Sequence, residues 1–223
     1  MNNLFKNYIK NSTIIHNLAS LFINLIPTFV LHNVEKYKII RYSIENTYMD
    51  SVKGDYLEFG TLTGSSLNHA INSYKKFHKN QNTYIYTFDS YEGFPVEIHK
   101  IFKSSDYIGN FNKVLKVASK YKNCEVVKGF FKDTLKKLKL RNKIKKISIV
   151  FIDCDLAKSS IDVFKFIKPR LSFGSLLIID DFFNVDINKD SIKNQFYKHF
   201  KRKDFEVVRY FGLQGIVFRY FKK

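Results

Sequence analysis

The feature that most constrains this fold is a regular alternation of short apolar runs with longer amphipathic segments. From residue 55 onward, five runs typical of buried strands are each followed by a segment with helical spacing. Strands joined by helical crossovers pair in parallel within one sheet. Two final apolar runs, separated only by Gly-Leu-Gln, predict an antiparallel hairpin. The sequence therefore predicts an α/β fold of the Rossmann-like type, with a mostly parallel seven-stranded sheet, helices on both faces and a C-terminal antiparallel hairpin.

The expected elements follow from the same pattern. Strands are expected at 55–59, 82–89, 124–129, 147–153 and 175–180, and the hairpin at 205–211 and 215–221. Helices are expected at 36–51, 65–77, 112–120, 133–140, 159–167 and 192–200. The chain is accordingly expected to contain one domain over 37–223, preceded by an N-terminal helical segment over 1–36 that serves in packing, dimer contacts or a lid.

The composition narrows the partners and the compartment. The formal net charge is +18, but the lysines are scattered, which favours a solvated basic surface over a nucleic-acid interface. A small-molecule or glycan acceptor, anionic or not, and an acidic membrane surface stay open as partners because positive charge attracts anions over long range. The only two cysteines lack metal-ligand or redox spacing, so a reducing, cytoplasmic location is expected.

One long apolar stretch lies near the N-terminus, at residues 18–31. Its 14 residues are too few to span a bilayer as a helix, and it lacks the small-residue cleavage site of a signal peptide. We expect no transmembrane segment here, but a helix packed on the domain or on a partner subunit of a homo-oligomer. A helix lying in the membrane interface is the alternative.

Glycines and polar side chains gather where the expected strands end. The first strand runs into Glu58, Gly60, Gly64, Ser65 and Ser66, a turn that lets a ligand approach the backbone and a helix N-terminus. This turn matches neither G-x-G-x-x-G nor a P-loop, and a plain tight turn is the alternative.

The second strand ends at Asp89, an acid placed to accept hydrogen bonds from ribose hydroxyls. A turn cap is the alternative function for this residue. Together with the glycine turn, Asp89 favours a nucleoside ligand.

The fourth and fifth strands end in carboxylates at Asp153, Asp180 and Asp181. A single crossover separates the two strands, so the strands are expected to be neighbours and the carboxylates to converge. Unpaired, they would raise one another's pKa. A hard divalent cation such as Mg²⁺ removes that repulsion. Helix capping is the alternative, and Asp155 fits that role.

The segments GDYLEFGTLTGSS, FDSYEGFP, YIGNF, VVKGFFKDTL, FIDCDLAKSS and PRLSFGSLLIIDDF occur in this order. Together they resemble the macrocin-type (TylF/MycF) O-methyltransferases from about residue 37 to residue 183. The resemblance implies the class I S-adenosylmethionine-dependent methyltransferase fold. It also implies S-adenosylmethionine as cofactor, with Mg²⁺ in many members, and transfer of a methyl group to a sugar hydroxyl.

The same resemblance implies a set of site residues. Those expected to bind the cofactor are Glu58, Gly60, Thr61, Gly64, Ser65, Ser66, Asp89, Ser90, Gly129, Phe130 and Asp153. Those expected to bind the metal are Asp153, Asp180 and Asp181, and the segment 92–110 corresponds to a lid. The lysine base of the related catechol O-methyltransferase is replaced here by Leu156. Asp153 or a bound water is therefore expected to take the proton.

Four functions are compatible with a fold of this class. An O-methyltransferase acting on a sugar, a surface glycan or a natural-product glycoside accounts for all the strand-end residues. An RNA methyltransferase accounts for the charge, but the chain shows no aromatic–basic recognition motif. The glycine spacing disfavours a nicotinamide oxidoreductase. A non-catalytic protein that retains the fold is disfavoured by the intact acidic cluster.

Overall fold

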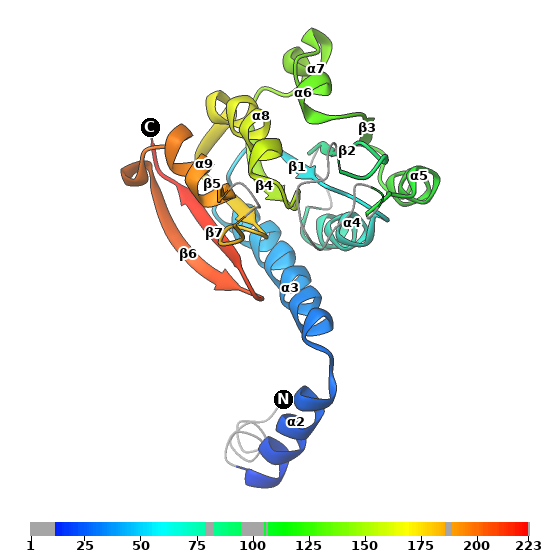
Figure 1. Cartoon of the computed structure of the whole chain (residues 1–223), viewed down its shortest axis with the longest axis vertical. Helices are drawn as coiled ribbons and strands as arrows, with labels where there is room; N and C mark the ends of the chain where they lie inside the picture. Colours follow the sequence, from blue (N-terminus) through cyan, green and yellow to red (C-terminus); the bar gives the residue numbers. More distant parts are fainter. Residues whose placement is uncertain (1–11, 79–82, 95–104, 106, 186–188, 223) are drawn as a thin grey trace.

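The computed structural model describes residues 12–78, 83–94, 105, 107–185 and 189–222, and the structural statements below concern these residues. Seven strands form one sheet in the order β3-β2-β1-β4-β5-β7-β6 (Figure 1). Strands β1 to β5 pair in parallel, whereas β7 runs antiparallel between β5 and β6. The predicted mostly parallel sheet with a terminal hairpin is confirmed.

The strands lie close to their expected ranges. They are β1 (Asp55–Phe59), β2 (Ile85–Asp89), β3 (Cys124–Lys128), β4 (Ile147–Ile152), β5 (Leu171–Ile179), β6 (Phe205–Phe211) and β7 (Gly215–Tyr220). The fifth strand begins four residues earlier than expected. Its first three residues, Leu171–Phe173, are not buried, and Gly174 separates them from the continuous apolar run that predicted the strand.

The helices alternate with the strands. They are α2 (Thr13–Leu25), α3 (Thr28–Met49), α4 (Ser65–Phe77), α5 (Phe111–Ala118), α6 (Phe131–Thr134), α7 (Leu138–Lys143), α8 (Ala157–Ile167) and α9 (Ile192–His199), with 3-10 turns at Lys168–Arg170 and Arg202–Asp204.

Two helix predictions were wrong in detail. The helix expected at 36–51 begins at Thr28, directly after Pro27, and so crosses the expected domain boundary between residues 36 and 37. The single helix expected at 133–140 is instead the short pair α6 and α7. Leu135 and Leu140 are both buried, and five residues in one helix would place them on different faces. Breaking the helix between them allows the chain to bury both.

Helices cover both faces of the sheet. Helices α3, α4 and α5 pack on one face, and α6, α8 and α9 on the other (Figure 1). In β1, Tyr56 and Leu57 point to opposite faces, and both are fully buried. This is the burial that continuous apolar runs in a parallel sheet predict.

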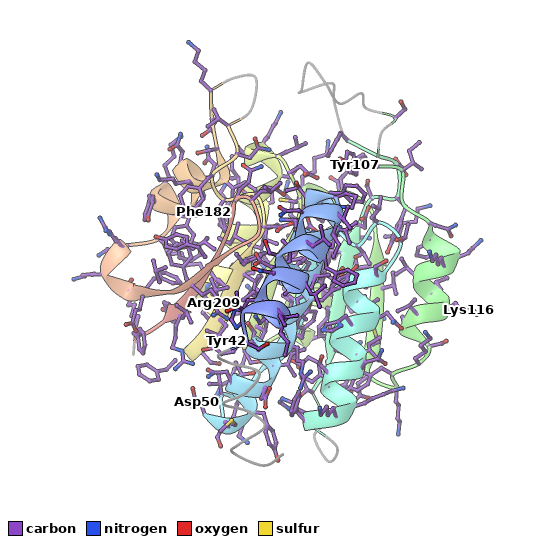
Figure 2. All side chains as sticks on the ribbon, turned by 90° about the horizontal axis from the view of Figure 1, so that it is seen from below. Tyr42, Asp50, Tyr107, Lys116, Phe182 and Arg209 are labelled. Carbon is purple, nitrogen blue, oxygen red and sulfur yellow. The ribbon has the colours of Figure 1, made fainter. Side chains whose placement is uncertain are left out.

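Helix α3 lies along one face of the sheet, between α4 and the β6–β7 hairpin (Figure 2). Arg209 of β6 lies over the ring of Tyr42 in α3, with 6.0 Å between the guanidinium carbon and the ring centroid. Helix α2 precedes α3 at an angle of 111° and projects from the body (Figure 1). Among the described helices, none has by itself the length and apolarity needed to cross a membrane, although the bent α2–α3 pair has both together.

A substitution at Gly60 tests how closely the loops after β1 and β4 pack against each other. A Cβ built on Gly60 would lie 1.7 Å from the backbone oxygen of Asp153, and the residue has a φ of 90°. We expect Gly60→Ala to lower the free energy of unfolding by about 3 kcal/mol or more, because the β1–α4 and β4–α8 loops must separate. Chemical denaturation monitored by circular dichroism measures this loss.

Gly64→Ala is the matched control, since Gly64 has a φ of 81° but its Cβ would meet side chains only at 3.4 Å. It should cost about 1–2 kcal/mol, the strain of the left-handed conformation alone. Equal losses at the two positions would contradict the close approach.

Candidate functional site

A cavity of about 700 Å³ opens at the carboxyl ends of β1, β2, β4 and β5. This is the edge at which open parallel sheets bind ligands, next to the point where the strand order reverses between β1 and β4. Ten of the residues singled out in the sequence line it: Gly60, Thr61, Ser65, Ser66, Asp89, Ser90, Phe130, Asp153, Asp180 and Asp181. Glu58 in β1, Gly64 and Gly129 do not contribute to the lining.

Asp89 holds the glycine turn in place. Its Oδ2 accepts hydrogen bonds from the backbone N–H groups of Thr61 and Leu62, both at 2.8 Å, and its Oδ1 accepts one from Tyr91. The turn-cap function considered for this residue is therefore present. Asp89 also lines the cavity, so the ribose contact stays a prediction.

The glycine turn places the N-terminus of α4 at the cavity. Gly64 is the N-cap residue of α4, and Ser65 and Ser66 are the first two residues of the helix. Gly64 has no side chain that could accept hydrogen bonds from the first N–H groups of the helix. These free N–H groups and the positive end of the helix dipole favour an anionic or carboxylate group of a ligand.

Glu58 lies beneath this turn and is fully buried. Its carboxylate accepts hydrogen bonds from the Tyr56 hydroxyl at 2.9 Å and the Ser66 hydroxyl at 2.8 Å. Burial raises the pKa of Glu58 to about 7, although these two hydrogen bonds oppose the shift. Ser66 lines the cavity, so Glu58 can affect a ligand through Ser66 without touching it.

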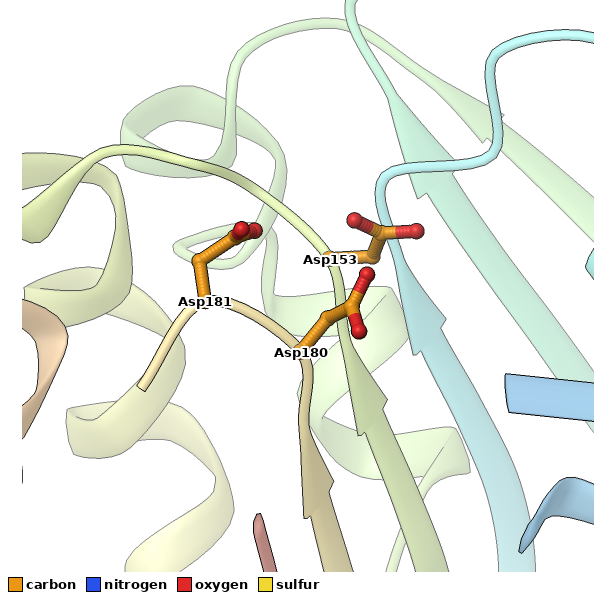
Figure 3. Close-up of side chains that lie close together, drawn as sticks. All are labelled: Asp153, Asp180 and Asp181. Carbon is orange, nitrogen blue, oxygen red and sulfur yellow. The ribbon is translucent and has the colours of Figure 1, made fainter. Parts of the chain in front are cut away.

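The predicted convergence of three carboxylates is confirmed. Asp153 follows β4, and Asp180 and Asp181 follow β5, so the pairing of these strands brings the side chains together (Figure 3). One carboxylate oxygen from each residue lies within 4.8 Å of the other two. Asp155, expected as a helix cap, lines the same cavity with a φ of 55°, and α8 has no side-chain cap.

A lysine that the sequence analysis did not select lies between two of these carboxylates. The Lys36 Nζ is 2.6 Å from Asp180 Oδ2 and 3.0 Å from Asp153 Oδ2, and it is supplied by α3. One helical turn earlier, His32 Nε2 lies 3.2 Å from Asp180 Oδ2. The His32 Nδ1 accepts a hydrogen bond from the backbone N–H of Leu213 in the β6–β7 turn, so Nε2 is the nitrogen that donates to Asp180.

The electrostatics of the cluster follow from burial and from this lysine. Burial raises the pKa of Asp153, and the Asp180 charge raises it further against the opposing charge of Lys36. Burial together with Asp155 and Asp153 raises the pKa of Asp181. Burial would raise the pKa of Asp180 as well, but the His32 hydrogen bond and the Lys36 charge outweigh it, and that pKa falls below its usual value. Burial lowers the pKa of Lys36, yet Asp153 and Asp180 more than reverse the effect.

One lysine does not satisfy the cluster. Asp180 Oδ1 and Asp181 Oδ2 are buried and lack a hydrogen-bond partner within the part of the chain that the structure describes. Buried carboxylate oxygens without donors are costly, and a cation with oxygen ligands would complete them. Asp153, Asp180 and Asp181 thus have the donor chemistry and spacing that a hard cation requires.

The segment expected as a lid is described only in part. Residues 95–104 and 106 of the expected 92–110 lie outside the described residues. Gly93, Phe94 and Tyr107, which flank them, line the cavity. No pattern in the sequence distinguished Lys36 or His32 from other residues, because their role depends on where α3 docks.

Comparison with known proteins gives a family match over most of the chain. The profile of the macrocin O-methyltransferase family (TylF) matches residues 29–207. One relative is the mycinamicin III 3''-O-methyltransferase of Micromonospora griseorubida, 25% identical over 159 residues, which are 64% of this chain and 61% of the relative. Another is the 8-demethyl-8-(2,3-dimethoxy-alpha-L-rhamnosyl)-tetracenomycin-C 4'-O-methyltransferase of Streptomyces olivaceus, 26% identical over 168 residues, covering 69% and 62% of the two chains. The chain thus spans about three fifths of the length of each.

Among solved structures, a calicheamicin methyltransferase superimposes with a TM-score of 0.71 at 17% identity, covering 96% of this chain and 89% of the other. At this identity the likeness establishes the fold, which is the class I methyltransferase fold expected from the sequence.

The buried Glu58 predicts a specific pH dependence. With a folded pKa of about 7 and an ordinary value of 4.5, Glu58 stays protonated in the folded protein while it ionises in the unfolded chain. Glu58 should therefore contribute a loss of about 3 kcal/mol to wild-type stability between these two pH values, and the loss should persist above pH 7. Glu58→Gln mimics the protonated acid, so its stability relative to wild type should rise across the same window.

Denaturant melts in metal-free buffer across this pH range measure the difference. Glu206→Gln, at an exposed position in β6, controls for the loss of one negative charge. A difference between Glu58→Gln and wild type that does not change with pH would refute the assignment.

The bridging lysine predicts a large stability effect. Lys36→Met leaves Asp153 and Asp180 without their cation, so in metal-free buffer we expect the free energy of unfolding to fall by about 3 kcal/mol or more. The double variant Lys36→Met/Asp180→Asn should recover part of this loss because one of the two carboxylates is gone. Lys38→Met, at an exposed position on the same helix, is the matched control. Equal stability of the Lys36 and Lys38 variants would show that the bridge contributes nothing.

Proposed function

The chain belongs to the macrocin O-methyltransferase family, and on that premise we propose that it is an S-adenosylmethionine-dependent, Mg²⁺-dependent O-methyltransferase acting on a hydroxyl group of a sugar. The observation that carries the proposal is the acidic cluster, in which two buried oxygens have no donor among the described residues, in the same cavity as a glycine turn and a helix N-terminus. The acidic cluster suits a metal ion that holds the methyl acceptor. The glycine turn and the helix N-terminus suit an adenosyl cofactor.

The residues proposed to hold the cofactor come from three strand ends. Gly60, Ser65 and Ser66 provide a close backbone approach and free N–H groups for its methionine part. Asp89 is proposed to accept from the ribose, and Phe130 to contact the adenine. The carboxylates across the cavity also favour a ligand that carries a positive sulfonium charge.

The metal is proposed to bind Asp153, Asp180 and Asp181. A divalent cation there would hold neighbouring acceptor oxygens and lower the pKa of the attacking hydroxyl. Lys36 forms ion pairs with Oδ2 of both Asp153 and Asp180. These ion pairs orient Oδ1 of each carboxylate away from the lysine. Lys36 thereby neutralises one charge and fixes the rotamers of two proposed ligands.

The proton of the acceptor hydroxyl also needs a base. Asp153 and Asp155 both line the cavity at the proposed metal site, so either carboxylate can come within hydrogen-bond reach of the acceptor hydroxyl. We propose that Asp153, or a water that it holds, takes the proton, with Asp155 as the neighbouring alternative.

The charge of the cavity favours a neutral acceptor. Among the described residues, six aspartates line it against three lysines: Asp89, Asp153, Asp155, Asp162, Asp180 and Asp181 against Lys36, Lys132 and Lys158. One divalent cation and one sulfonium cofactor would balance this excess, so a further negative charge on the acceptor is not needed. A neutral sugar fits, and the name of one relative includes a rhamnosyl group.

The same charge distribution disfavours the RNA alternative. A phosphate backbone needs a basic surface along its path into the site. Of the 38 Lys and Arg residues behind the net charge of +18, three are among the described residues that line the cavity, whereas six aspartates line it. The anionic acceptor considered from the sequence is disfavoured for the same reason.

Ligand binding tests the proposal. Wild type should bind S-adenosylhomocysteine at roughly −8 kcal/mol, and chelation should leave this affinity nearly unchanged because the metal contacts the acceptor. Asp89→Ala should weaken binding at least tenfold, by loss of both the ribose acceptor and the turn cap. Mg²⁺ should raise the melting temperature of wild type but not of Asp180→Asn/Asp181→Asn, in which two of the proposed ligands are gone. Calorimetry and thermal melts measure these effects.

Ser159→Ala is the control for the cofactor measurement, since it removes a hydroxyl of α8 that lines the same cavity but has no proposed role in holding the cofactor. Preferential binding of NADH would overturn the class of cofactor. An equal response of wild type and the double variant to Mg²⁺ would overturn the metal site and leave the cofactor assignment standing.

A further inference from the structure

The edge of the sheet opposite the cavity carries exposed apolar side chains. The cavity opens at the carboxyl ends of the parallel strands, so the other edge consists of the amino ends of β1 to β6 and the carboxyl end of β7. Tyr107, which lines the cavity, and Asp50, which follows α3, lie toward opposite ends of the molecule (Figure 2). Met49, Phe173 and Phe221 at this second edge expose 74%, 52% and 37% of their surfaces.

These side chains belong to segments that contact one another. The rings of Phe173 and Phe221 meet edge to face, with 5.6 Å between their centroids. A Cβ built on Gly174 would lie 2.9 Å from the Val52 side chain, so the turn after α3 packs on the first part of β5. Val52 is half-buried, and Met49 is the last residue of α3 before this turn. We call Met49, Val52, Phe173 and Phe221 the amino-edge cluster.

Exposed lysines lie along the same edge. Among the described residues, six exposed lysines lie within two residues of a strand terminus there: Lys53, Lys122, Lys145, Lys146, Lys203 and Lys222. They are far apart in the sequence, and they share one side of the molecule because the strands share one direction. Lys53 adjoins Val52, and Lys222 adjoins Phe221. Lys203 is close as well, because the backbone N–H of Phe221 donates to the carbonyl of Asp204 at 2.9 Å.

The acidic side chains at this edge leave it predominantly basic. Two of them form ion pairs, Asp50 with Arg219 and Glu125 with Lys143. The others are the half-buried Asp55 and Asp204 and the exposed Glu206. The edge thus combines an apolar centre with an excess of exposed positive charge, whereas the cavity at the opposite edge is lined by six aspartates.

An anionic membrane surface matches both features. Exposed apolar patches with a polar rim mark interaction sites, and lysines beside them are attracted to anionic headgroups. A second copy of this basic chain would be repelled. A nucleic acid would attract the lysines, but Met49 and Val52 have no aromatic face on which a base could stack. We propose that the amino-edge cluster and its lysines dock on a negatively charged lipid bilayer.

Docking in this orientation keeps the site accessible. The cavity lies at the edge of the sheet that faces away from the lipid, so it opens to the aqueous phase. The acceptor therefore reaches the cavity from solution and does not cross the bilayer. The proposal concerns a surface outside the cavity, and it does not depend on the reaction that the site performs.

Flotation of the full chain with lipid vesicles tests the docking. Wild type should bind vesicles of phosphatidylcholine mixed with phosphatidylglycerol, and added salt should weaken the binding by screening the lysines. Lys53→Gln/Lys203→Gln/Lys222→Gln should lower the partition coefficient roughly a hundredfold, since one lysine near an anionic surface contributes roughly a factor of five.

A matched triple variant separates local contact from net charge. Lys113→Gln/Lys116→Gln/Lys193→Gln removes the same charge from exposed positions on α5 and α9. It should lower the partition coefficient only roughly threefold, by long-range attraction alone.

A second variant tests the apolar centre. Met49→Gln/Phe173→Thr keeps the helix and strand propensities and changes no charge. It should lower the partition coefficient at least roughly tenfold, because apolar surface that would enter the lipid is gone. The salt dependence should stay that of wild type, since all the lysines are present.

Other outcomes overturn the proposal. These are a wild type that does not bind the anionic vesicles, and equal losses for the two lysine variants. Equal binding to pure phosphatidylcholine would assign the lipid contact to α2, which lacks charged side chains. Displacement from the vesicles by single-stranded RNA with the same lysines required would make the edge a nucleic-acid surface instead. Circular dichroism and melting temperature establish that each variant is folded.

Discussion

The rest of the structure depends on the repulsion among carboxylates at the ends of β4 and β5. Parallel strands that end together place Asp153 and Asp180 side by side, and Asp181 follows at once. Their mutual repulsion in a site of low dielectric would be expensive without compensation. The fold compensates in part with the Lys36 ammonium, and the two remaining oxygens without donors are those that a divalent cation would satisfy. The same excess of negative charge suits a sulfonium cofactor and a neutral acceptor.

Helix α3 connects this site to distant parts of the chain. Its Lys36 reaches the acidic cluster, while His32 links Asp180 to the backbone of Leu213 in the β6–β7 turn. Glu35 accepts a hydrogen bond from the Gly212 N–H of the same turn at 2.5 Å. A Cβ on Gly212 would lie 2.1 Å from the His32 ring, so the close packing of turn and helix requires glycine there. The C-terminal hairpin thus supports the site through α3, without lining the cavity itself.

The two charge features of this protein belong to different surfaces. Lysines scattered along the chain give it a net charge of +18, whereas the cavity collects aspartates from three strand ends. Net charge alone would suggest an anionic substrate. The aspartates in the cavity instead favour a substrate without negative charge. Helix α2, which carries no Lys, Arg, Asp or Glu and exposes large apolar side chains, is a third kind of surface.

The sequence by itself determined the class of fold and ten of the residues that line the cavity. Continuous apolar runs predict strands buried on both faces, and their alternation with helices predicts parallel pairing. The sequence therefore places the carboxyl ends of β4 and β5, with their aspartates, next to each other. The resemblance to macrocin-type enzymes identified the loops. Only the tertiary structure decided that Glu58 supports the turn from beneath, that Asp89 caps it, and that Lys36 bridges two carboxylates. These roles arise from contacts between segments up to 144 residues apart, such as Lys36 and Asp180, and local patterns carry no information on which lysine docks there.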